Sequence, residues 1–250
     1  MKSSMNSIEK GLFVLESLTE FDFPVSLKVL TQRTRLPKPT LYRILQTLVR
    51  TEYVTQESDQ GHYAISPKLA EIGSSQRHSA LKEAVLPRME RLYHAFAETV
   101  NLGVLVGTNV QYLHVLETEK SLRWIVRPGA QDAYYCTALG RAIAAFLPHE
   151  AQERLLVQGK LERRTPKTPS DVEHLKRILR QARDNGWALD DEENAVGVVC
   201  FAAPLFRKGT PVAAVSISVP KSRLTPALKS EIVQALESLD KDLPTSLAYR

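Results

Sequence analysis

The chain has 250 residues, of which 43% are hydrophobic, and its formal net charge is +5. This length is enough for two domains of about 100–200 residues each, and the positive charge permits a nucleic-acid partner without requiring one. The sequence contains no apolar run long enough to span a membrane, its start MKSSMNSIEKG lacks the apolar core of a signal peptide, and Cys136 and Cys200 do not have the spacing of a disulfide framework. We therefore expect a cytoplasmic protein.

The first predicted helix covers Ser7 to Leu18, with Ser7 as its N-cap. Ile8, Leu12 and Leu15 share one helical face with Leu18. We expect this face to pack against the next two helices and to complete a three-helix core.

Residues 24–48 read PVSLKVLTQRTRLPKPTLYRILQTL and predict two short helices joined by a tight turn. Ser26 is placed to cap the first helix, and Pro39 falls in the first turn of the second, where a missing N–H is harmless. The apolar stripe of the second helix consists of Leu41, Ile44, Leu45 and Leu48. Its opposite face is polar, which is typical of a helix-turn-helix whose second helix enters a DNA groove.

Charge supports the same interpretation. No Asp or Glu occurs between Phe23 and Thr51, whereas basic residues recur through this stretch. A polyanion is attracted to such a surface by its field and by counterion release. An ordinary helical hairpin with a solvated charged face is the alternative, but helix-turn-helix spacing and acid-free basic surface coincide here. The DNA contacts we expect come from Ser26, Lys28, Arg33, Arg35, Lys38, Thr40, Tyr42, Arg43 and Arg50.

We expect these residues to make two kinds of DNA contact, with phosphates and with bases. Thr40, near the helix N-terminus, can hold a phosphate through its hydroxyl and backbone N–H. Arg43 is the best candidate for bidentate recognition of guanine, and Lys38 and Tyr42 share its groove-facing side. The phosphate contacts are assigned to Lys28, Arg33, Arg35 and Arg50.

A hairpin and a linker are predicted next. Residues 52–56 and 62–65 alternate like strands around the polar loop 57–61. A hairpin directly after a reading helix is the wing of a winged helix, and its tip usually lies near the DNA backbone; a hairpin that only closes the small core is the alternative. We expect a winged helix-turn-helix domain over residues 1–66 and a linker helix over 67–80, of a kind that commonly pairs with a copy of itself.

The remainder, residues 81–250, predicts a second domain. It begins with an amphipathic helix that reaches Phe96, into which Pro87 fits only close to the first turn. Predicted strands cover 101–106, 111–116, 122–126, 187–189, 198–206 and 212–219, and predicted helices cover 137–147, 149–156, 170–185 and 225–243. Ser170 and Gly186 would cap the third of these helices. Helices framing an antiparallel or mixed sheet give an α+β fold that resembles sensor domains of the GAF and PAS type.

Several side chains of this domain suit a small hydroxy- or oxo-carboxylate. Ser216 and Ser218 lie at i, i+2 on one face of a strand and offer hydroxyl donors. Asp190 can accept a hydrogen bond from a ligand hydroxyl, and Cys200 supplies a small wall. Backbone N–H groups near Thr137 and Ala138 would favour an anion.

The predicted effector site has further candidate residues and an alternative interpretation. Trp124, Tyr134 and Tyr135 are candidates for a larger or aromatic end of the pocket. Alternatively, Ser-Ile-Ser is only the polar edge of a strand, and a lone buried cysteine is commonly a core residue.

The sequence resembles the isocitrate-lyase-regulator (IclR) family of bacterial transcription factors, in order and over nearly its full length. The matching stretches are Ser26-Leu27, Leu36 to Thr40, Arg43-Ile44-Leu45, Ile65 to Leu69, Thr137 to Ala142, Asn185 to Ala188, Glu192-Glu193, Gly197 to Leu205 and Ser216-Ile217-Ser218. The resemblance implies a winged-helix domain, a linker helix and an effector-binding domain that work as dimers or dimers of dimers. It places the effector pocket around Ala138, Leu139, Asp190, Cys200, Ser216 and Ser218, to which we add Leu122 and Trp124.

The sequence departs from the family pattern at three positions. Arg35 stands where members usually have Gly, which adds a cation beside the reading helix. Glu52 replaces the usual Gly before the wing, so that turn can differ in shape. Arg141 replaces the usual Lys and keeps the charge. The first two departures make the exact DNA contacts less transferable.

We therefore expect a repressor of a catabolic operon rather than an activator. Its partners would be double-stranded operator DNA, a small carboxylate effector and further copies of itself, without a cofactor or a membrane. A metal-responsive regulator and a ligand-independent DNA-binding protein are the alternatives. Catalysis is not expected, because the sequence contains no G-x-S-x-G, H-E-x-x-H or phosphate loop, and its histidines lack the spacing of zinc ligands.

Overall fold

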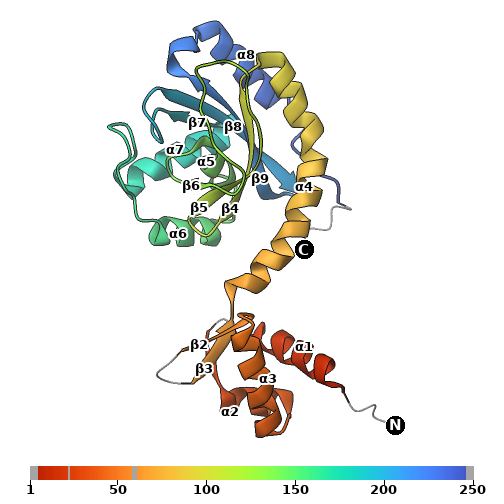
Figure 1. Cartoon of the computed structure of the whole chain (residues 1–250). Coiled ribbons are helices and arrows are strands. Elements are labelled where there is room, and N and C mark those ends of the chain that lie inside the picture. Colours follow the sequence, from red (N-terminus) through yellow and green to blue (C-terminus); the bar gives the residue numbers. More distant parts are fainter. Residues whose placement is uncertain (1–4, 22, 58–60, 246–250) are drawn as a thin grey trace. The chain divides into compact units, whose positions relative to one another are not determined.

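Three helices and a small sheet form the first of the two units into which the chain divides, Met1–Arg77 and His78–Arg250 (Figure 1). The computed structural model describes residues 5–21, 23–57 and 61–245, with 70–77 described by their helix alone. The predicted wing tip at residues 58–60 lies outside the described residues.

Helix α1 (Ser7–Leu18) begins as predicted, but its cap is Asn6 rather than Ser7. The Asn6 side-chain oxygen accepts from the N–H groups of Ile8 and Glu9 at 3.0 Å, and the Glu9 carboxylate accepts in return from the Asn6 N–H. This capping box satisfies N–H groups that the helix itself leaves free. The predicted buried face is confirmed in part, because Leu18 is buried and Leu15 packs against the core, whereas Ile8 is 76% exposed and Leu12 is 56% exposed. Val14 is buried as well.

Helices α2 (Leu27–Thr34) and α3 (Lys38–Arg50) confirm the predicted helix-turn-helix. The Ser26 hydroxyl caps α2 by accepting from the Val29 N–H at 3.4 Å. Arg35, in the turn, has a φ of 55°, a left-handed conformation that glycine adopts more easily. Leu41 and Leu45 of α3 are fully buried, and Ile44 and Leu48 pack against the same core.

The wing is a three-stranded sheet rather than a plain hairpin. Strands β2 (Val54–Glu57) and β3 (His62–Ile65) form the expected hairpin, and β1 (Val25–Ser26) pairs with the other side of β3. Strand β1 could not be predicted, because a strand of two residues is too short to show an alternating pattern. Glu52, which replaces the usual glycine before the wing, has a φ of 63°, so the backbone here keeps a conformation that glycine favours.

Helix α4 (Pro67–Phe96) is one continuous helix of 30 residues, whereas the sequence suggested a linker followed by a separate helix. Pro87 lies inside α4 and not in a first turn, so that prediction was wrong. Val85 and Met89, on either side of it, are fully buried in the core of the second unit. Burial of this face outweighs the helix hydrogen bond that the proline cannot make.

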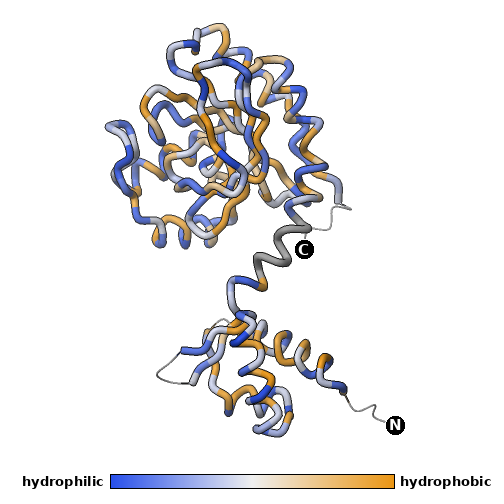
Figure 2. The backbone as a smooth tube through the Cα atoms, in the orientation of Figure 1, coloured by the Kyte–Doolittle hydropathy of each residue, from blue (hydrophilic) through white to orange (hydrophobic). Residues whose placement is uncertain are grey.

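The second unit is built on a six-stranded antiparallel sheet with the strand order β6-β5-β4-β9-β8-β7. The strands are β4 (Thr99–Val106), β5 (Asn109–Leu116), β6 (Gln131–Ala133), β7 (Ala188–Asp191), β8 (Val198–Arg207) and β9 (Thr210–Pro220). The strand predicted at 122–126 is absent, because Leu122 and Ile125 are 59% and 58% exposed and make no ladder. The strand that pairs with the outer side of β5 is β6, not the predicted 122–126 segment. Hydrophobic residues concentrate in the central strands (Figure 2).

Helices cover both faces of this sheet. Helices α4 and α8 (Pro226–Glu237) share one core with it, and α5 (Ala138–Ala144) and α7 (Val172–Asn185) share the other. Helix α6 (His149–Gln158) and the short helix η1 (Lys221–Arg223) complete the unit. These findings confirm an α+β fold with an N-terminal winged helix.

Several helix ends differ from the prediction, among them that of α5, which ends at Ala144 and not at residue 147. Asp171, not Ser170, caps α7 by accepting from the His174 N–H at 2.7 Å, whereas Gly186 ends it with a φ of 75°, as expected. Helix α8 ends at Glu237 rather than near Leu243. The following segment turns back to β8, where the Leu243 N–H donates to the Phe206 carbonyl at 2.8 Å.

Candidate functional site

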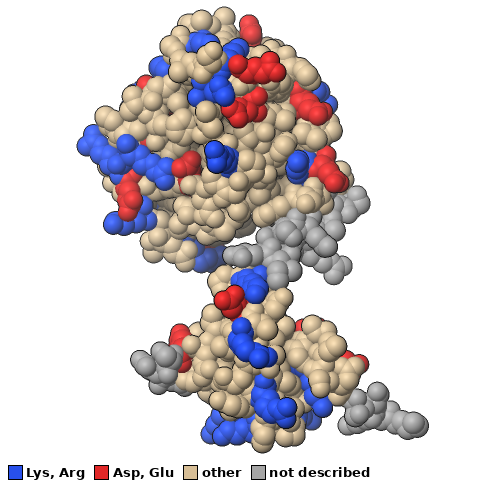
Figure 3. Space-filling view, viewed as in Figure 1, with Lys and Arg blue, Asp and Glu red and all other residues tan. Residues whose placement is uncertain are grey.

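Exposed cations surround the helix-turn-helix. Lys28, Arg35, Lys38, Arg43 and Arg50 are all exposed, and none forms an ion pair with any residue that the structure describes. Basic side chains gather over the part of the first unit built by α2 and α3 (Figure 3). Their charges are therefore available to an external polyanion.

Arg33 differs from the other predicted phosphate contacts. Its guanidinium is bound by both carboxylate oxygens of Glu20, with Nε 2.5 Å from Oε2. Glu20 lies just outside the acid-free stretch, so the sequence argument overlooked it. This pairing neutralises Arg33 locally, and we expect it to contribute less to DNA binding than the unpaired cations.

The predicted reading face of α3 is open to solvent. Tyr42 is 49% exposed, Lys38 and Arg43 are exposed, and Thr40 is half-buried. A hollow with a volume of about 780 Å³ lies beside this face, and α1 lines its other side. Ser26, in contrast, has its hydroxyl engaged in capping α2.

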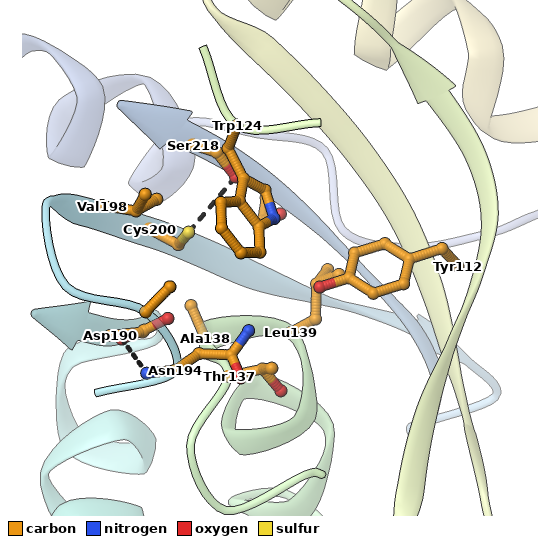
Figure 4. A pocket seen from close by; sticks show the side chains of 12 residues that line it. Tyr112, Trp124, Thr137, Ala138, Leu139, Asp190, Asn194, Val198, Cys200 and Ser218 are labelled. Atoms are coloured by element: carbon orange, nitrogen blue, oxygen red, sulfur yellow. Dashed lines mark hydrogen bonds between the residues drawn. The ribbon is translucent and has the colours of Figure 1, made fainter. Parts of the chain in front are cut away.

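A second candidate site lies in the other unit, between the start of α5 and strands β8 and β9 (Figure 4). The cavity is lined by Tyr112, Trp124, Thr137, Ala138, Leu139, Asp190, Asn194, Ala195, Val198, Cys200, Ser216 and Ser218. All the predicted effector residues except Leu122 are in this group. Leu122 is largely exposed, and its carbonyl accepts from the Arg223 guanidinium at 2.7 Å.

Sequence reasoning missed Tyr112 and Asn194 as lining residues. Tyr112 follows the strand alternation of β5 and could have been found from it, whereas Asn194 lies in a loop without periodicity. Tyr134 and Tyr135, the candidates for an aromatic end, are buried in the core on this side of the sheet instead. The Tyr135 hydroxyl donates to the Glu162 carbonyl at 2.9 Å.

The two serines are held from a neighbouring strand. The side-chain amide of Asn101, on β4, donates to Ser216 Oγ at 3.1 Å and to Ser218 Oγ at 3.0 Å. Ser218 Oγ also lies 3.2 Å from Cys200 Sγ. Because each serine oxygen accepts from Asn101, each hydroxyl can donate its own hydrogen, which Ser218 can give to Cys200 or to a ligand. The pocket is therefore suited to ligand groups that accept hydrogen bonds.

Asp190 is a buried carboxylate at the cavity wall, 3% exposed. It accepts from the backbone N–H groups of Glu193 at 2.7 Å and Asn194 at 3.2 Å. Burial raises the pKa of Asp190 to about 7, although the nearby charge of Arg141 acts in the opposite direction. At neutral pH this carboxyl can therefore both donate and accept hydrogen bonds.

We expect Asp190→Asn to change how stability depends on pH. Below about pH 4 the carboxyl is protonated in both the folded and unfolded protein, whereas above pH 7 the folded protein holds a buried charge. Stability of the wild type relative to Asp190→Asn should therefore fall as pH rises, on the order of 2 kcal/mol between pH 5 and pH 8. Urea unfolding at the two pH values measures this. Parallel changes in both proteins would contradict it, and the exposed Asp184→Asn is the control.

The cavity has little free volume. The space open to a water molecule is about 10 Å³, roughly what one water needs. The rings of Trp124 and Tyr112 face the space above Ala138 and Leu139 (Figure 4). An organic effector must therefore displace part of this wall.

Within residues 5–21, 23–57 and 61–245, no three His, Cys, Asp or Glu side chains are grouped as metal ligands would be. Within the same ranges, no helix is long and apolar enough to cross a membrane.

Both units match models of known protein families. Residues 7–58 match the IclR helix-turn-helix domain, and residues 74–243 match the C-terminal domain of the bacterial transcriptional regulator IclR. Similar proteins include the HTH-type transcriptional regulator KdgR of Escherichia coli (strain K12), which is 30% identical over 98% of this chain and 94% of its own length. The transcriptional repressor IclR of the same strain is 33% identical over 88% of this chain and 82% of its own length.

A solved structure shares the fold. The IclR of Thermotoga maritima is 28% identical, covers 93% of this chain and 95% of its own, and superposes with a TM-score of 0.62. These relatives are named as regulators of transcription and not as enzymes.

Proposed function

Because the chain belongs to the IclR family of bacterial transcriptional regulators, we propose that it is a repressor of a catabolic operon whose operator binding is controlled by a small organic acid. We assign the reading domain to residues 1–66, the linker helix to 67–80, and effector binding and oligomerisation to 81–250. The protein would act in the cytoplasm, where its operator lies, as a homodimer or a dimer of dimers.

The observation that carries the DNA-binding part of this proposal is the reading face of α3. Lys38 and Arg43 are exposed there without an acidic partner among the described residues, and Lys28 and Arg35 extend the same charge onto α2 and the turn. Two such helices, one from each subunit, would enter successive major grooves of a roughly palindromic operator. Arg43 would recognise a base, and the surrounding cations would hold phosphates.

The effector part rests on the donors around the closed cavity. Ser216 and Ser218 present hydroxyls fixed by Asn101, and Asp190 faces them with a carboxyl that is partly protonated at neutral pH. A hydroxy- or oxo-carboxylate offers acceptors for the two serine hydroxyls, and a hydroxyl or carbonyl for the Asp190 carboxyl. The effector would favour one of two arrangements of this domain, and this preference would change operator affinity through α4.

A retardation experiment tests the proposal. The purified protein should bind a fragment of its own promoter region more tightly than a random duplex of equal length. The affinity should fall steeply with salt, since each neutralised phosphate adds about −0.9 to the slope of log K against log salt. A panel of small carboxylates should raise the unfolding temperature of the second unit and change operator affinity. Failure to retard any promoter fragment at low ionic strength, with or without the panel, would refute it.

A further inference from the structure

A carboxylate that is not itself part of the cavity lining binds two residues that are. Asp132, on β6, accepts from the Tyr112 hydroxyl at 3.1 Å and from the Asn194 side-chain amide at 3.2 Å, both through Oδ2. Its other oxygen, Oδ1, accepts from Nη1 of Arg164 at 2.5 Å. Tyr112 and Asn194 both line the cavity. The Asp132 carboxylate therefore bridges two groups of the cavity wall.

The Asn194 amide is fixed in orientation, and the Tyr112 hydroxyl keeps its proton. The Asn194 side-chain oxygen accepts from Nη1 of Arg164 at 2.6 Å, which directs its amide nitrogen toward Asp132. Burial, reinforced by the charge of Asp132, raises the pKa of Tyr112 well above its usual range, so its hydroxyl stays protonated. A guanidinium, an amide and a hydroxyl that converge on one carboxylate are a complete recognition set for that group.

Asp132 belongs to a short strand at one edge of the sheet. β6 is an edge strand of three residues whose partner in the sheet is β5. The connection from β5 to α5 carries both Asp132 and Trp124, and Trp124 also lines the closed cavity. Movement of this one connection would withdraw Asp132 from its donors and Trp124 from the cavity together.

We propose that Arg164, Asn194 and Tyr112 form the carboxylate subsite of the effector pocket, and that Asp132 occupies this subsite until the effector's carboxylate replaces it. The inference depends on the proposed function for its biological meaning, because it identifies which group of the effector is recognised. Charge favours exchange over addition: a ligand carboxylate added beside Asp132 would meet a like charge, whereas replacing Asp132 leaves the charge around Arg164 unchanged.

Chemical rescue with acetate tests the subsite without knowledge of the effector. Asp132→Ala should lower the midpoint of thermal unfolding, followed by fluorescence of Trp124 and Trp187, which are the two tryptophans of the chain. Acetate should restore the midpoint saturably in this variant, since a ligand that binds only the folded state stabilises it. Acetamide, and chloride at equal ionic strength, should not. The further change Arg164→Ala should abolish the rescue.

The controls make each outcome decisive. Asp184→Ala removes an exposed carboxylate of α7 and should show no response to acetate. Equal stabilisation of Asp132→Ala by acetate and acetamide would overturn the subsite. If the alanine variant does not fold, Asp132→Asn is the substitute, because it preserves the side-chain volume. Acetate should change the tryptophan fluorescence of Asp132→Asn at a concentration at least tenfold below that needed for the wild type. Equal concentrations for the two proteins would overturn the proposal. Promoter retardation by the wild type, measured without acetate, tests the regulator function separately.

Discussion

Replacing Arg43 with alanine should remove operator preference while leaving non-specific DNA binding largely intact. Arg43 is exposed on the reading face of α3 and has no ion-pair partner among the described residues, so its guanidinium is free to make a bidentate contact with guanine. Loss of such a contact costs about 1–3 kcal/mol of discrimination, which is roughly a 5- to 150-fold fall in the ratio of operator to random-duplex affinity. Competition binding at a fixed salt concentration measures this ratio.

Two matched variants separate base recognition from charge. Lys28→Ala should weaken operator and random duplex by the same factor and reduce the salt slope by about one unit. Arg33→Ala should have the smallest effect, because Glu20 already holds its guanidinium. Equal losses of operator preference in all three variants would show that Arg43 does not recognise a base.

Gly140→Ala should destabilise the effector-binding unit by about 3 kcal/mol or more. A methyl group built on Gly140 would lie 2.5 Å from the carbonyl oxygen of Tyr134 and 2.8 Å from its carbonyl carbon, so the backbone itself would have to move. Gly140 is inside α5, two residues after Ala138 in the cavity wall. The added methyl should therefore also disturb effector binding. Denaturant unfolding followed by tryptophan fluorescence measures the loss.

Gly11→Ala is the matched control for this substitution. Gly11 is likewise inside a helix, α1, but a methyl group there would meet no atom within 4 Å. Alanine is the better helix former, so this variant should stabilise the first unit by about 0.5–1 kcal/mol. Its tryptophan transition should match that of the wild type, since Trp124 and Trp187 both lie in the second unit. A wild-type transition for Gly140→Ala would contradict the prediction.

Sequence periodicity predicted the parts of the fold in which apolar and polar residues alternate regularly. One example is the stripe of α3, which is covered by a core; another is β9, where Ser216 and Ser218 alternate with buried apolar residues. The prediction was only partly right at α1, where Leu15 and Leu18 pack against the core but Ile8 and Leu12 remain exposed. It failed at residues 122–126, where Leu122 and Ile125 are exposed, Trp124 lines the cavity and the segment has no strand partner.

Contacts between distant segments were beyond sequence reasoning. Glu20 approaches Arg33 only after α1 and α2 have packed, and the binding of Asp132 by Arg164 joins residues separated by 32 positions. Asn101 is an unremarkable strand residue in the sequence, yet its amide holds both pocket serines from the neighbouring strand. The chemical types in the effector pocket could be predicted, but their partners depend on strand order.

The small volume of the effector cavity has a kinetic consequence. A ligand that can enter only after Trp124 and its connection have moved would bind no faster than that movement occurs. The observed rate of association would then level off at high concentration instead of rising in proportion to it. Pulses of metabolite shorter than this movement would pass without response, and only a supply that outlasts it would change operator binding.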